Sequence, residues 1–145
     1  MNSNNKLSNR LFDLFPSNKN PFDYSETKSL NTSISIMSHA QKAFKFLVKP
    51  ASDLYEITPL HGEIWPHKTA DVCIKMDYSK LNPNELNECK FVVEGQDMEH
   101  IETISQKMEV TITCLPRKTS PGNYNAKIKY EFSGQGVHKT FERSQ

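Results

Sequence analysis

Apolar or β-branched residues recur at every second position in short runs along most of this chain of 145 residues. A β-strand needs such alternation when one face lies on a core and the other faces water, whereas a helix repeats every 3.6 residues. Runs with the two-residue period occupy 32–36, 44–48, 72–76, 91–93, 110–114 and 128–132. We therefore expect an all-β fold in which about seven or eight short strands form a sandwich.

The prolines of the chain divide these runs. Proline has no amide hydrogen to donate to a strand ladder, so it belongs at strand ends and in turns. None of the eight prolines interrupts an alternating run. One short helix is predicted near 84–89, where Asn82 is a candidate cap and Pro83 a candidate first-turn residue. The stretch 96–106 is polar and predicts a loop or one helical turn.

The chain reads as one domain with two appendages, because domains commonly hold about 100 to 150 residues. Residues 1–10 are rich in Asn and Ser and predict a polar arm, and 11–116 hold most of the alternating runs and predict the sandwich. Residues 117–145 begin as a turn-rich, basic linker and predict a hairpin around Ser133-Gly134-Gln135-Gly136. Two interpretations of this tail stay open: it completes the sandwich, or it reaches outward to a neighbour.

Charge and composition narrow the classes of function. Lys and Arg number 18 against 17 for Asp and Glu, which gives little attraction to nucleic acid or anionic lipid. No apolar run approaches the roughly 20 residues that cross a bilayer, and the polar start has no signal-peptide core. The three cysteines are an odd number and are expected to be buried, reduced thiols in a cytoplasmic protein.

The sequence shows no motif that carries chemistry. His61 and His67 are separated by Gly62 and Pro66 and do not form the helical zinc pattern His-Glu-x-x-His, so no metal site is expected and no cofactor is indicated. The cysteines have no local sign of an activated thiolate, and we expect a protein that is not an enzyme. Trp65 keeps two interpretations, a surface anchor for a partner or a cover over the end of the sandwich.

Four segments are specific enough to compare with a known family. They are Pro21-Phe22-Asp23, Phe44-Lys45-Phe46, the segment 55–64 with its Tyr-x-Ile-x-Pro-x-x-Gly-x-Ile pattern, and Pro83-Asn84-Glu85 followed by Lys90-Phe91. In this order they resemble the major sperm protein (MSP) domain, especially the form in the vesicle-associated membrane-protein-associated (VAP) receptors. The resemblance covers 11–116. It implies an immunoglobulin-like, seven-stranded β-sandwich of the MSP/PapD-like type with no catalytic centre.

The resemblance also implies a peptide-binding face. In the receptors, a basic and partly apolar face binds short acidic (FFAT-like) peptides that carry two aromatic residues. By position, Lys45, Lys90 and Lys107 match basic residues of that face, and Val92 lies where the family has methionine. A row of lysines would attract an acidic peptide, and an apolar notch at Val92 would hold an aromatic ring.

Among the departures of the chain from the receptors, two bear directly on function. The stretch 47–52 lacks their Thr-Thr pair, whose hydroxyls help to hold the peptide, and is one residue longer. The chain also has no counterpart of their coiled coil and membrane anchor, so we do not expect a tether to the endoplasmic reticulum.

Two functional hypotheses follow. The first is a non-enzymatic assembly module of the MSP type that acts by edge-strand addition in a cytoskeletal structure such as a cilium, an axoneme or a sperm filament. The second is a soluble VAP-like adaptor that binds acidic, aromatic-containing peptides through Lys45, Lys90, Val92 and Lys107. Both predict a cytoplasmic protein with other proteins as partners, without nucleic acid and without membrane insertion.

Overall fold

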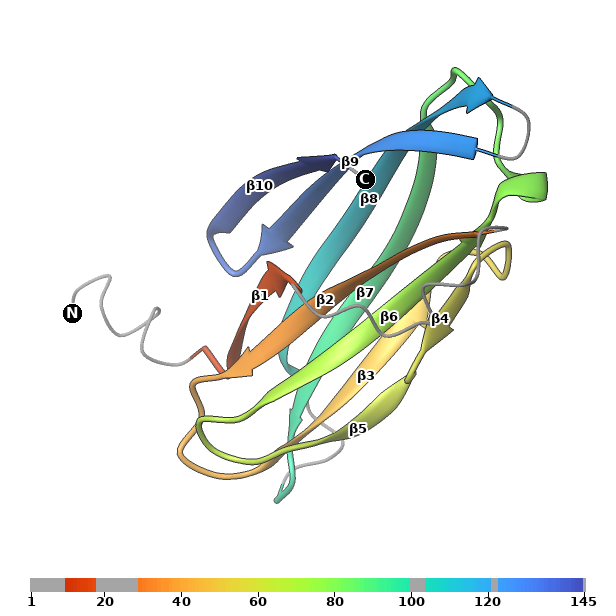
Figure 1. Ribbon diagram of the computed structural model, residues 1–145. Coiled ribbons are helices and arrows are strands. Elements are labelled where there is room, and N and C mark those ends of the chain that lie inside the picture. The colour runs from red at the N-terminus through yellow and green to blue at the C-terminus, as the bar shows by residue number, and fades with distance from the viewer. Residues whose placement is uncertain (1–9, 18–28, 100–103, 121–122, 145) are drawn as a thin grey trace.

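Two antiparallel β-sheets make up the fold in a computed structural model that describes residues 10–17, 29–99, 104–120 and 123–144 (Figure 1). The first sheet has the order β1 (Phe12–Pro16), β2 (Ser29–Ser38), β6 (Thr69–Asp77), β4 (Glu56–Thr58). The second has the order β10 (Val137–Ser144), β9 (Asn123–Gly134), β8 (Ile104–Ser120), β7 (Asn87–Asp97), β3 (Phe44–Pro50), β5 (His61–Ile64). The predicted all-β sandwich is confirmed.

The sandwich has ten strands in its described part rather than the seven that the family resemblance implies. The difference has two sources. The segment 55–64 supplies two short strands, β4 and β5, which belong to different sheets, and the tail adds β9 and β10 to the second sheet. The predicted polar arm lies outside the described residues except for Arg10, and so does Pro21-Phe22-Asp23.

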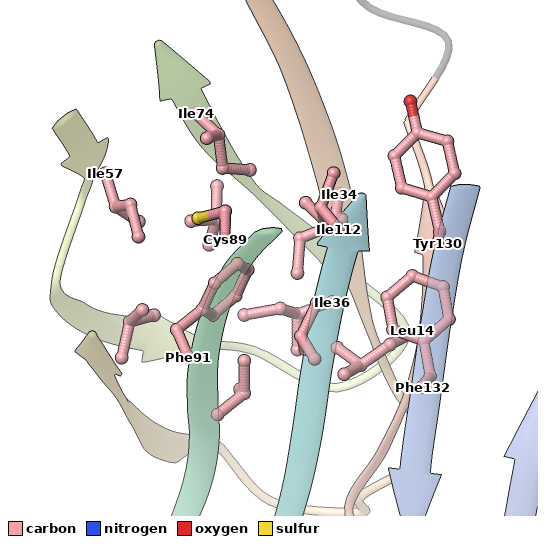
Figure 2. Close-up of a cluster of buried hydrophobic side chains, with 14 of the residues drawn as sticks. Leu14, Ile34, Ile36, Ile57, Ile74, Cys89, Phe91, Ile112, Tyr130 and Phe132 are labelled. Carbon is pink, nitrogen blue, oxygen red and sulfur yellow. The ribbon is translucent and has the colours of Figure 1, made fainter. Parts of the chain in front are cut away.

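The core lies between the sheets and is formed by the alternating runs that the sequence shows. Ile34 and Ile36 of β2 and Ile74 of β6 are buried against Phe91 of β7 and Ile112 of β8 (Figure 2). Because each run alternates, its other positions face outward on both sheets. The prediction of which positions face the core therefore holds for these strands.

The tail is built into the second sheet. β8 continues to Ser120, so 117–120, which the sequence predicts as a linker, form strand and pair with β9 as in Arg117 opposite Asn125. β9 contributes Tyr130 and Phe132 to the core, both with no exposed surface. The Tyr130 hydroxyl lies 2.5 Å from the hydroxyl of Thr32 on the other sheet. In the structure, this segment completes the sandwich.

The predicted short helix at 84–89 is wrong, because these residues form a turn and the start of β7. The buried Asn87 side chain satisfies the backbone of this turn. Its carbonyl oxygen accepts from the Asn82 N–H (2.9 Å), and its amide donates to the carbonyl oxygens of Asn82 (3.1 Å) and Glu85 (3.0 Å). Side-chain bonds from the next strand thus replace the helical bonds that the cap pattern indicates.

Strand β1 belongs to the first sheet but is also hydrogen-bonded to the second. The side-chain oxygen of Gln106 on β8 accepts from the N–H groups of Leu11 (2.6 Å) and Phe12 (3.0 Å), and its amide donates to the Phe12 carbonyl (2.9 Å). Beside it, a Cβ on Gly95 would lie 2.9 Å from the Phe12 ring and 3.0 Å from a Leu11 methyl. The buried Gln106 side chain thus hydrogen-bonds β1, and the lack of a side chain at Gly95 leaves room for Leu11 and Phe12.

Candidate interaction surfaces

The four residues predicted to bind a peptide lie on one face of the molecule, the outer face of the second sheet. Lys45 lies on β3, Lys90 and Val92 on β7, and Lys107 on β8, and each alternates with core positions of its strand. The three lysines are exposed and Val92 is half-buried. Their shared face follows from the two-residue period of neighbouring strands in register.

Only two of the four residues meet in one groove. Lys90 and Val92 line a shallow groove of about 340 Å³ together with Lys49, Glu109 and Thr111. Lys45 lines a different hollow, beside β5, and Lys107 lines neither of these two. The structure therefore brings Lys90 and Val92 together in one groove and places Lys45 in a different hollow. Lys107 lies on β8 two residues from Glu109 of the groove.

Glutamates accompany the lysines on this outer face, which sequence reasoning missed. Lys90 lies 3.3 Å from Glu88, and Lys49 lies 3.1 Å from Glu94, whose side chain is 4 % exposed. In the strand register, Glu94 is opposite Lys107 and Glu109 is opposite Val92. These glutamates occupy the same alternating positions of their strands as the lysines, so the two-residue period of the sequence could have placed them on the same face. The acids offset the positive field that an acidic peptide would need.

Trp65, the other predicted interface residue, lies in the turn between β5 and β6 and is 63 % exposed. Its carbonyl accepts a hydrogen bond from the Lys68 N–H (3.1 Å) and closes the turn. An indole this exposed does not cover the end of the sandwich. A role as a surface anchor stays a prediction.

The surroundings of the three cysteines raise the pKa of each thiol. Cys89 and Cys114 are buried, and burial raises the pKa of Cys89 to about 12 and that of Cys114 to about 11. Burial also raises the pKa of the half-buried Cys73 thiol. A nucleophilic cysteine needs the opposite shift. Within the described ranges, no group of three or more His, Cys, Asp or Glu side chains is arranged to hold a metal ion.

The longer edge of the second sheet is β10, which has only β9 beside it among the described strands (Figure 1), and the other edge is β5. A two-residue turn, Gln135 and Gly136, joins β9 and β10, and both residues have positive φ (53° and 75°), as a type I′ turn requires. Gly134 and Val137 flank this turn and form a hydrogen-bonded pair. By alternation, the N–H and C=O groups of 138, 140, 142 and 144 point away from β9.

The inner face of β10, formed by the side chains of 139, 141 and 143, contacts β1 and the adjoining Ser17. The Lys139 ammonium lies 4.3 Å from the centre of the Phe15 ring and 4.0 Å from the Asp13 carboxylate. The Phe141 ring contacts the Phe15 ring edge-on, with centroids 6.3 Å apart, and Arg143 donates to the Ser17 carbonyl (2.8 Å). The strand is thus held in position, and no described strand pairs with its outer edge.

The fold and its surfaces define an all-β sandwich domain with one long open edge. Among the described residues, no helix has the length and hydrophobicity of a membrane span.

No family model matches the chain, and no curated protein matches it. Similar solved structures include two proteins of Caenorhabditis elegans. SSP-19, an MSP-domain protein-like family member, is 19 % identical with a TM-score of 0.41, and the match covers 49 % of this chain and 63 % of SSP-19, less than two thirds of its length. WR4, an MSP family member, is 16 % identical with a TM-score of 0.44, and the match covers 61 % of this chain and 73 % of WR4.

Proposed function

We propose that this chain is a non-enzymatic protein-interaction module of the MSP type that binds a strand of a partner protein along the open edge of β10. The observation that carries the proposal is the orientation of β10: side chains of its inner face contact Phe15 and Ser17, and no described strand pairs with the backbone groups of its outer edge. Main-chain hydrogen bonds to an added strand supply affinity in this mode of recognition. A cytoplasmic, cytoskeletal assembly such as a cilium, an axoneme or a sperm filament is the setting we propose from the family resemblance.

The chemistry of β10 supports this use. Proteins usually protect an edge strand with a proline, an outward lysine, a bulge or a short length. β10 is eight residues long and has no proline, and it pairs with β9 without a register shift. Its one lysine, Lys139, is held against Phe15 and Asp13. The described edges of the other strands are shorter: β1 has five residues, β5 four and β4 three.

The proposal is tested with Thr140→Pro, which removes an N–H from the open edge and leaves the bonds to β9 intact. We expect the intact chain to capture native complexes that Thr140→Pro loses, while both proteins keep the same near-UV circular dichroism. Thr140→Ser is the matched control, because it retains the N–H and should retain the partners. Equal capture by all three proteins would show that β10 is not the binding edge.

A second candidate function is the adaptor for acidic peptides, and the observation in its favour is that Lys90 and Val92 line the same groove. Titration of an acidic peptide with two aromatic residues should then show binding that added salt weakens. Lys90→Glu should weaken it about tenfold or more, because the reversed charge would join Glu88 and Glu109 at the groove.

The matched control for this titration is Lys127→Glu, which makes the same charge change on β9, away from the groove. Equal weakening by both substitutions would indicate a general charge effect and no site at Lys90. No binding at all would remove the adaptor. We favour the edge of β10, because the glutamates beside the lysines offset their charge.

A further inference from the structure

We infer that the strand that pairs with β10 is the β10 of a second copy of this chain, so that two sandwiches join edge to edge in an antiparallel, two-fold dimer centred on Thr140. This inference rests on the proposed function, since it names the partner of the same edge. The two six-stranded sheets would become one continuous sheet across the dimer axis.

Backbone geometry limits the registers that such a dimer can adopt. The outward N–H and C=O groups belong to His138, Thr140, Glu142 and Ser144. An antiparallel pair forms hydrogen bonds only where outward positions of the two copies face each other. The two-fold axis must therefore place one residue directly opposite its own copy, and we call that residue the centre of the register. This leaves a small set of registers along an eight-residue strand.

Most of these registers place like charges opposite each other. A register centred on Lys139 places that lysine opposite its own copy. A register centred on Phe141 places Lys139 opposite Arg143 twice, and one centred on Glu142 places that glutamate opposite its own copy. Like charges directly opposite across a strand pair are destabilising. A register centred on His138 overlaps over only a few residues of each strand and aligns two imidazoles.

The register centred on Thr140 is complementary along its length. His138 lies opposite Glu142 of the second copy and Glu142 lies opposite its His138, so an acid faces an imidazole on both sides of the axis. Lys139 lies opposite Phe141, an arrangement that the strand already uses where Lys139 rests on Phe15. Three outward pairs with two hydrogen bonds each give about six main-chain bonds. The strand β10 is thus complementary to itself in one register.

The experiment is sedimentation of the purified, intact chain over a range of concentrations. We expect a monomer–dimer equilibrium. Thr140→Pro should weaken it by about tenfold or more, because each copy loses an N–H at the centre of the strand pair. Glu142→Lys should weaken it about tenfold, because the carboxylate opposite each His138 imidazole is replaced by an ammonium that cannot accept a hydrogen bond. The double variant His138→Glu with Glu142→Lys places a carboxylate opposite an ammonium in both pairs and should recover the dimer.

The double variant also separates the dimer from a loss of folding. A variant that merely misfolds is not rescued by a second charge change on the same strand, so recovery supports the inference. A monomer at every concentration would overturn it, and so would a dimer that these variants leave unchanged. If the chain is monomeric and Thr140→Pro still loses its native complexes, another protein supplies the strand and the proposed function stands. If those complexes are also unaffected, both proposals are wrong.

Discussion

Removal of residues 117–145 is expected to abolish the cooperative fold of this chain. Three side chains of the removed segment, Ile128, Tyr130 and Phe132, are at most 1 % exposed. Complete burial of each contributes about 1.5–3 kcal/mol, so their loss costs roughly 5–9 kcal/mol. Domains of this kind are stable by about 5–15 kcal/mol in total. The truncation also exposes the long edge of β8, which is a risk for aggregation.

Urea unfolding followed by circular dichroism measures this effect. The matched control ends at Gly134 and removes only 135–145, that is, the turn and β10. No described residue in that segment is fully buried, so the shorter truncation should remain folded at reduced stability. If the chain ending at Pro116 unfolds cooperatively at nearly the same urea concentration as the intact chain, then 11–116 is a complete sandwich and the tail is an appendage.

Local periodicity predicted the faces of the strands correctly, because it depends only on neighbouring residues. Ile34, Ile36 and Phe91 are buried where the alternation placed them. The end of β8 shows the limit of this reasoning. The stretch from Arg117 onward has turn-forming and basic residues, and it is strand as far as Ser120 because β9 pairs with it. The local sequence of 117–120 gives no information about a pairing strand that comes later in the chain.

The helix prediction at 84–89 failed for a related reason. Asn82 and Pro83 satisfy a helix-start pattern, which takes account of only a few adjacent residues. In the fold, Asn87 binds the turn backbone, and the Asn84 N–H donates to the Pro116 carbonyl (2.8 Å). Contacts with later residues therefore satisfied groups that a helix would otherwise bond.

The candidate sites also have features that the local sequence predicts and features that depend on the whole fold. The shared face of Lys45, Lys90 and Lys107 followed from strand parity, and the sequence was sufficient for it. Lys90 pairs with Glu88 of its own strand, whereas the position of Glu94 opposite Lys107 depended on register. The open edge at β10 depended on the order of strands in the sheet. Strand order is a property of the whole fold, so no motif in 137–144 could identify that edge.

Substitution of Gln106 with Leu is expected to release β1 from the second sheet. Leucine fills a similar volume but removes the acceptor for the N–H groups of Leu11 and Phe12 and the donor to the Phe12 carbonyl. Each buried group left without a partner costs about 1–3 kcal/mol, so the loss is roughly 3–9 kcal/mol for three groups if none finds water. Amide hydrogen exchange of 11–16, together with urea unfolding, measures it.

The contacts that hold β1 decide whether Gln106→Leu opens β1 locally or lowers the stability of the whole sandwich. β2 pairs with β1 along its length, so β1 can open locally with water entering at Gln106, or the whole sandwich can lose stability. Fast exchange confined to 11–16 indicates local opening, and a lower unfolding midpoint indicates a global loss. Gln96→Leu is the matched control, because Gln96 is a half-buried glutamine on the outer face of the same sheet. If both substitutions have the same small effect, the three hydrogen bonds of Gln106 do not hold β1, and its pairing with β2 and packing over Gly95 must account for its position.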